Sequence, residues 1–232
     1  MIVLITPTGA RPKQFELCQR WMRNQTYKGK VFWIIIDDCF PFTSDIKVPF
    51  PANWTIVKKY PRPVWRQGMN TQGRNMKAGI DIVKCLPKDK VEAIFIIEDD
   101  DYYKPIYLEQ MMLRMKNYDI IGETNTIYYH VPGKRWDLSR NRKHSSLFQT
   151  AFTLNVIPIL EKHYNEKYID ISLFEESKNQ YLFSANNLAT GMKGQTGRGG
   201  IGNGHKIRTT DVLDSNLSKL KELTGEDYKY YQ

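Results

Sequence analysis

Short, unbroken apolar runs alternate along the first hundred residues with segments whose apolar positions recur at helical spacing. Residues 2–6 (IVLIT), 30–38 (KVFWIIIDD) and 91–100 (VEAIFIIEDD) are typical of buried β-strands. Between them, residues 13–25 and 70–86 carry apolar side chains near one helical face and predict helices. Strand, helix, strand, helix, strand at this spacing predicts right-handed crossovers and a parallel sheet, which is an α/β fold.

Each predicted strand ends in a polar loop, namely TPTGAR, DDCF and EDDDYY. The carboxyl ends of parallel strands meet at one edge of the sheet, where open α/β sheets bind their ligands. The third strand runs directly into four carboxylates: Glu98, Asp99, Asp100 and Asp101. Adjacent carboxylates repel and raise one another's pKa unless a cation compensates them, and their oxygens suit a divalent metal clamped to a diphosphate. Asp37 and Asp38 alone are explained equally well by a strand-end turn.

Composition limits the class of protein. A chain of 232 residues with 41% apolar positions is long enough for one domain with a sizeable core. No apolar run approaches a membrane span of about 18 residues, and the N-terminus lacks the features of a signal peptide, so we expect a soluble, cytoplasmic protein. The net charge of +9 favours a polyanionic partner, although a well-solvated basic surface is an equally good explanation.

Four stretches follow one another between residues 1 and 110: ITPTGARP, NQTYKGKVFWIIIDD, GRNMKAGI and IIEDDDYYKP. In this order they resemble the nucleotide-sugar-binding half of a GT-A glycosyltransferase, particularly the large inverting family 2 group. That resemblance implies a GT-A fold, which is a Rossmann-like, mostly parallel sheet flanked by helices in a single domain. Residues 1–110 would be the nucleotide-sugar-binding half. Residues 111–232 would be the acceptor-binding half, with a Gly-rich loop and a C-terminal helix.

The resemblance also implies a metal-dependent glycosyltransferase that uses Mn2+ or Mg2+ and a nucleoside-diphosphate sugar, with a UDP-sugar as the first expectation. Position by position, it assigns the donor pocket to Thr6, Pro7, Arg11, Asp37, Asp38, Arg74 and Asn75. Counted back from Pro105, Glu98, Asp99 and Asp100 correspond to the acidic DxD motif of the family. Asp100 would then be the principal metal ligand, Asp99 would lie near the ribose, and Asp101 would be a second ligand or an acceptor-side group. Glu98 departs from the commonest pattern of the motif.

An inverting transfer needs a base that takes the proton of the acceptor hydroxyl. Family 2 enzymes place it in an EDxxL-like segment, and YIDISLFEES is the nearest match. The resemblance therefore implies Asp170 as the catalytic base, with Glu175 and Glu176 as further candidates. Each of them is equally compatible with a solvated acid at the start of a helix.

The segment GMKGQTGRGGIGNGHK, residues 191–206, is too rich in glycine for a regular element. We expect a loop whose cations, Lys193 and Arg198, contact the diphosphate and whose His205 contacts the metal or the diphosphate. A connector without function is the alternative.

The acceptor is suggested by two stretches that combine aromatic rings with basic groups, GKRWDLSRNRKH and RPVWRQ. Such groups suit phosphate contacts and base stacking, so Trp65, Arg66, Trp136, Arg140, Arg142 and Lys143 are candidates for contacting a hydroxymethylated base in DNA. Small size and a Lys-, Asn- and Tyr-rich composition are similar to those of phage-encoded proteins. A surface glycan, a lipid-linked glycan or a protein as acceptor remains open, as do a non-enzymatic nucleic-acid-binding protein and a nucleotidyltransferase.

Overall fold

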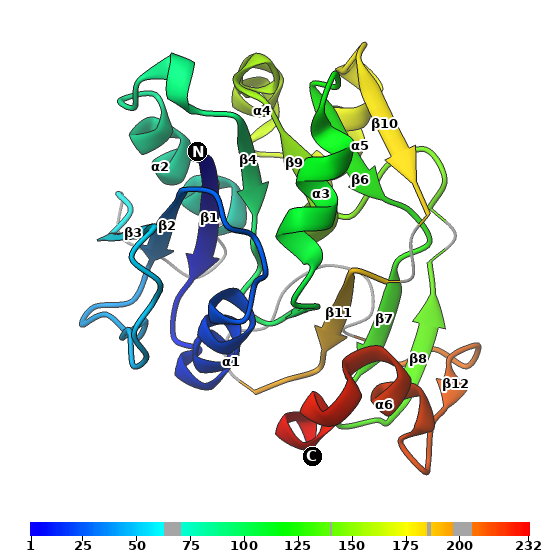
Figure 1. Cartoon of the computed structure of the whole chain (residues 1–232). Coiled ribbons are helices and arrows are strands. Elements are labelled where there is room, and N and C mark those ends of the chain that lie inside the picture. The colour runs from blue at the N-terminus through cyan, green and yellow to red at the C-terminus, as the bar shows by residue number, and fades with distance from the viewer. Residues whose placement is uncertain (63–70, 140, 185–186, 197–205) are drawn as a thin grey trace.

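The computed structural model describes residues 1–62, 71–139, 141–184, 187–196 and 206–232. Its main sheet has the strand order β10-β6-β9-β4-β1-β2-β3 (Figure 1). The strands are β1 (Ile2–Thr8), β2 (Val31–Asp37), β3 (Trp54–Lys59), β4 (Ala93–Ile96), β6 (Ile120–Glu123), β9 (Thr150–Phe152) and β10 (Gln180–Phe183). β9 is antiparallel to β4 and β6, and every other pair in this sheet is parallel. The parallel sheet predicted from the first three strands is confirmed, and β3 adds an edge that the hydrophobic pattern did not predict.

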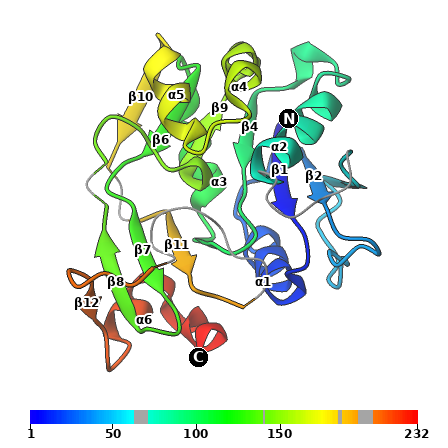
Figure 2. The ribbon, with the colours of Figure 1, turned by 180° about the vertical axis from the view of Figure 1, so that it is seen from behind.

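Helices cover both faces of this sheet. α1 (Pro12–Arg23) and α3 (Tyr107–Met115) lie on the face that Figure 1 turns to the viewer. The opposite face, seen in Figure 2, carries α2 (Thr71–Val83), α4 (Ile157–His163) and α5 (Ile169–Glu176). Successive strand residues point to opposite faces, so Ile2 and Leu4 pack in the core beneath α1, while Val3 and Ile5 pack against α2. Continuous apolar strands are therefore buried on both sides, as parallel sheets require.

A smaller sheet has the order β12-β8-β7-β11-β5. Its strands are β5 (Tyr102–Tyr103), β7 (Ile127–His130), β8 (Arg135–Leu138), β11 (Ala189–Lys193) and β12 (Val212–Leu213). α6 (Ser218–Thr224) and a 3-10 helix, η4 (Gly225–Tyr231), end the chain, and shorter 3-10 turns span Lys88–Lys90, Leu147–Gln149 and Leu154–Val156. One continuous core contains residues of both sheets, which makes the molecule a single mixed α/β domain. No described helix is long and apolar enough to cross a membrane.

The start of the Gly-rich segment corrects one expectation. We expected no regular element in residues 191–206, yet Gly191, Met192 and Lys193 belong to β11 and pair in parallel with β7. Glycine at 191 is explained by close packing, because a Cβ there would lie 2.4 Å from Cδ1 of Tyr128. Residues 197–205 lie outside the described part of the chain.

Candidate active site

The polar ends of β1, β2 and β4 meet at one edge of the main sheet. Thr8, the last residue of β1, pairs with Asp37 of β2, and the amide of Asp38 donates to the Thr8 carbonyl at 3.0 Å. β4 is followed by a tight turn in which the amide of Asp101 lies 3.4 Å from the Glu98 carbonyl. We call the four carboxylates of this turn, Glu98, Asp99, Asp100 and Asp101, the acidic cluster.

Arg11, in the loop after β1, neutralises one side of the acidic cluster. Its Nη1 donates to Oδ2 of Asp100 at 3.0 Å, and its Nη2 pairs with Asp99. The hydroxyl of Thr8 donates to the other oxygen of Asp99 at 2.6 Å. Burial raises the pKa of Asp99 to about 7, against the opposing charge of Arg11. The sequence placed Arg11 in the donor pocket, and the structure joins it to the acidic motif itself.

Lys193, at the end of β11, neutralises the other side. This lysine is only 4% exposed, and its Nζ lies 2.9 Å from Oδ1 of Asp101 and 3.9 Å from Oε2 of Glu98. The amide of Met192 donates to the same Asp101 oxygen at 2.9 Å, and Gln72 of α2 donates to Oε1 of Glu98 at 2.8 Å. Burial raises the pKa of both Asp101 and Glu98 in spite of the lysine.

The acidic cluster fits a divalent metal ion. Glu98, Asp100 and Asp101 each offer a carboxylate oxygen, and these oxygens lie within 4.8 Å of one another. The second oxygen of Asp101, Oδ2, is buried and has no hydrogen-bond partner among the described residues. A buried acceptor without a donor is costly, and a hard cation would satisfy it while lowering the raised pKa values.

Asp38, Arg74 and Asn75, which the sequence assigned to the donor, lie together. Oδ2 of Asp38 accepts hydrogen bonds from Nη2 of Arg74 at 2.9 Å and from Nδ2 of Asn75 at 3.1 Å. Asp38 is 5% exposed and packs against the backbone of Gly9. Only glycine leaves space for this contact, because a Cβ at residue 9 would lie 1.8 Å from Oδ1 of Asp38. The loop after β1, the end of β2 and the first turns of α2 therefore form one polar group.

Other donor candidates have internal roles. Asp37 accepts from the amides of Cys39, Thr43 and Ser44 at 2.9, 2.7 and 2.8 Å, which is the strand-end turn stated above as the alternative. Thr6 is fully buried, and its hydroxyl accepts from Nε1 of Trp33 at 2.8 Å. Pro7 is a buried residue of β1. Thr8, which no pattern singled out, is the threonine that contacts the acidic cluster, and its position two residues after Thr6 on the same face of the strand was the available signal.

The three candidates for the catalytic base have different surroundings. Asp170 lies in the first turn of α5, close enough to the acidic cluster that its charge contributes to the raised pKa of Glu98. Its own pKa is raised by burial, against the charge of His144 and the backbone amides of the helix start. Glu175 is exposed, and Glu176 is paired with Lys162 and His163 on the surface at 2.7 Å each. The fold thus brings Asp170, of the three, near the acidic cluster.

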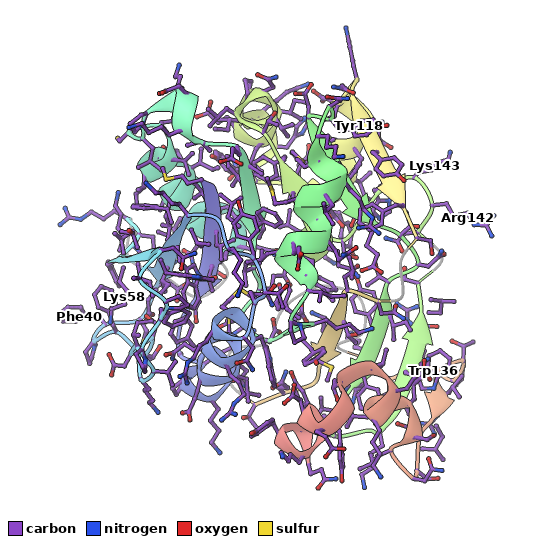
Figure 3. All side chains as sticks on the ribbon, in the orientation of Figure 1. Phe40, Lys58, Tyr118, Trp136, Arg142 and Lys143 are labelled. Carbon is purple, nitrogen blue, oxygen red and sulfur yellow. The ribbon has the colours of Figure 1, made fainter. Side chains whose placement is uncertain are left out.

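The described candidates for binding the acceptor, Trp136, Arg142 and Lys143, do not lie together. Trp136 packs against the core, and Nζ of Lys219 lies 4.8 Å from the centroid of its ring, beside α6 (Figure 3). Arg142 and Lys143 are exposed and project near β10, well away from Trp136. The other acceptor candidates, Trp65, Arg66 and Arg140, lie outside the described residues. Arg198 and His205, which we expected to contact the diphosphate or the metal, lie outside them as well.

No family model and no curated protein sequence matches the chain. Solved structures do match its fold. S. aureus TarS 1–349 has a TM-score of 0.56 at 10% sequence identity over 82% of this chain and 60% of that one. The same TarS segment in complex with UDP-GlcNAc has a TM-score of 0.53 at 10% identity, covering 84% of this chain and 60% of that one. Another structure of TarS has a TM-score of 0.53 at 9% identity, covering 82% of this chain and 36% of that one.

The chain therefore spans about a third to three fifths of the length of the structures it matches. At these identities the likeness shows the fold, and it confirms the GT-A-type α/β arrangement expected from the sequence.

Proposed function

We propose that the protein is a glycosyltransferase that moves a sugar from a nucleoside-diphosphate sugar, with UDP as the nucleotide, to an acceptor hydroxyl. The observation that carries the proposal is the acidic cluster at the carboxyl end of β4. It is joined to Thr8, the last residue of β1, and to Arg11 in the loop that follows. Ligands of open α/β sheets bind at this edge. A TarS structure with the same fold contains UDP-GlcNAc, which supports a nucleotide sugar as the ligand.

The residues of the cluster would hold a divalent metal, Mn2+ or Mg2+, through Glu98, Asp100 and Asp101. Such a metal would offset the negative charge that develops on the leaving diphosphate. Asp38, Arg74 and Asn75 would orient the nucleoside and the diphosphate from the end of β2 and the start of α2. Asp99 is held by Thr8 and Arg11 and would lie near the ribose.

Asp170 would act as the base of an inverting transfer. The raised pKa of this partly buried carboxylate makes it a stronger proton acceptor than an exposed one, provided that it is ionised when the acceptor binds. Its place at the start of α5, close enough for its charge to act on Glu98, suits a group that takes a proton from the acceptor hydroxyl.

The acceptor proposal is a hydroxyl of a glycan or protein, or of a hydroxymethylated base in DNA. A DNA acceptor is supported by the net charge of +9 and by the exposed Arg142 and Lys143. It draws no support from Trp136, because that ring is packed beside α6 and apart from these cations. Stacking on an extruded base would have to come from another residue.

The proposal is tested by the hydrolysis of a panel of nucleotide sugars and by Asp100→Asn. We expect wild-type protein to hydrolyse a UDP-sugar slowly in Mn2+ or Mg2+. Asp100→Asn should lower the rate about a hundredfold or more and weaken UDP binding, because it removes a hard anionic ligand. Calorimetry with UDP and a coupled assay for UDP release measure the two effects.

Asp89→Asn is the matched control, because it removes the same negative charge from a distant place. Asp89 is exposed in the 3-10 turn that precedes the amino end of β4. It should behave as wild type. Full hydrolysis in excess chelator would remove the metal from the proposal. If the protein binds none of the nucleotide sugars in the panel, the proposed function itself is overturned.

A further inference from the structure

Lys193 is a buried lysine beside the acidic cluster. It is 4% exposed, so its ammonium has lost nearly all of its water. The ammonium lies 5.5 Å from the ring centroid of Phe148 and 5.7 Å from that of Tyr128, distances at which aromatic rings attract a cation. Its position is fixed by β11, whose pairing with β7 brings the backbone close to Tyr128.

The contacts of Lys193 are with the carboxylates that offer a metal site. Nζ lies 2.9 Å from Oδ1 of Asp101 and 3.9 Å from Oε2 of Glu98, and both residues belong to the group of three whose oxygens converge. Arg11 takes the other side of the cluster, on Asp99 and Asp100. Among the described residues, Arg11 and Lys193 are two cations against four carboxylates, so they do not balance the acidic cluster when all four carboxylates are ionised.

We propose that the ammonium of Lys193 is a built-in counter-ion of the acidic cluster, which keeps Asp101 and Glu98 together without metal and weakens the binding of a divalent metal to them. The proposal rests on the proposed function only in taking the acidic cluster as the metal site. A metal that binds Asp101 and Glu98 must share them with a cation or push it aside. The ammonium would then have to leave Oδ1 of Asp101, and a bound diphosphate would offer it new oxygens.

This role differs from that of an ordinary donor contact. A lysine that only binds the diphosphate would strengthen donor binding and leave the affinity for metal alone unchanged. A built-in counter-ion instead lowers the affinity for metal alone. Its removal raises that affinity, and it leaves the buried Asp101 without its charged partner. The two roles are therefore separated by measuring metal binding with no nucleotide present.

The test is the affinity for Mn2+ alone, measured by electron paramagnetic resonance of free Mn2+ in wild type, Lys193→Met and Lys58→Met. Lys193→Met should bind Mn2+ at least about tenfold more tightly than wild type, because it removes a positive charge 2.9 Å from Oδ1 of Asp101 and 3.9 Å from Oε2 of Glu98. Lys58→Met removes the same charge from a surface lysine that is paired with Asp45 at 3.5 Å, and it should match wild type within about twofold. Equal or weaker Mn2+ binding by Lys193→Met would overturn the proposal.

A second measurement does not depend on how Lys193→Met folds. In wild-type protein with 15N-labelled lysine, Mg2+ should shift the side-chain ammonium resonance of Lys193, identified by its loss in Lys193→Arg. A resonance that does not move at saturating Mg2+ would overturn the proposal. Neither measurement uses a sugar donor, so the two proposals can fail separately. If Lys193→Met binds Mn2+ more tightly than wild type but wild type hydrolyses no nucleotide sugar, the counter-ion proposal is upheld and the glycosyltransferase proposal is rejected.

Discussion

At the scale of single residues, burial separates acids that the sequence presents as equivalent. Asp170, Glu175 and Glu176 all lie on α5, a helix of eight residues. Burial raises the pKa of Asp170, whereas hydrogen bonds to Lys162 and His163 lower the pKa of Glu176 at the surface. A proton acceptor that must reach a substrate in the crevice is better supplied by the first of these groups.

Substitution of Asp170 by Asn tests this assignment. We expect Asp170→Asn to lower kcat about a hundredfold or more with little change in the affinity for UDP, because the amide keeps the shape of the side chain but cannot take a proton. Single-turnover transfer and calorimetry with UDP measure the two quantities. Glu175→Gln and Glu176→Gln provide the comparison. If one of them loses the activity and Asp170→Asn keeps it, the base is on the other side of the helix.

At the scale of elements, α2 brings Arg74 and Asn75 to the site because its first turn packs closely against the backbone of Tyr164, the residue after α4. The α-carbon of Gly73 faces Tyr164, and a Cβ at this position would lie 1.8 Å from the Tyr164 carbonyl oxygen. Backbone cannot move as a flexible side chain does, so only glycine permits this approach. The same short distance sets where the next two residues of the helix point.

Gly73→Ala should therefore destabilise the protein, although glycine is normally the poorer residue inside a helix by about 1 kcal/mol. We expect a loss of about 1–3 kcal/mol in the free energy of unfolding, as for other overpacked sites, together with weaker UDP binding through displaced Arg74. Denaturant unfolding and calorimetry measure both. Lys77→Ala, on the exposed side of α2, should stay within about 0.5 kcal/mol of wild type. A Gly73→Ala protein that is more stable than wild type would show that α2 can shift freely.

At the scale of the whole molecule, the net charge of +9 is a property of the surface, and the fold distributes it. Three of the described cations are paired inside the site: Arg11 and Lys193 with the acidic cluster, and Arg74 with Asp38. Arg142 and Lys143 remain exposed near β10. A polyanionic acceptor would be attracted by these exposed charges on its way to the acidic cluster.

If DNA is the acceptor, the double variant Arg142→Gln/Lys143→Gln should bind duplex DNA more weakly and with a flatter salt dependence. Each lost phosphate contact should reduce the slope of log affinity against log salt by about 0.9. Fluorescence anisotropy at several salt concentrations measures the slope. Lys88→Gln/Lys90→Gln removes two exposed charges at the amino end of β4 and should leave the slope unchanged. Wild-type protein without salt-dependent binding would leave a glycan or protein hydroxyl as the acceptor.

The sequence by itself determined the α/β class, the first three parallel strands and the edge at which the polar groups gather. These follow from local patterns, since a buried parallel strand must be apolar throughout and its carboxyl end must leave the sheet in a polar loop. The ordered motifs also indicated Asp38, Arg74 and Asn75, which the fold brings into contact.

The tertiary structure decided which charges meet. Lys193 is 92 residues from Asp101 in the chain, and only the pairing of β11 with β7 and β5 brings its ammonium to the acidic cluster. Trp136 and Arg142 lie six positions apart in one basic stretch of sequence, yet β8 carries the first into the small sheet while the second stays on the surface. Contacts between distant segments depend on strand order and register, which the period of a single segment does not specify.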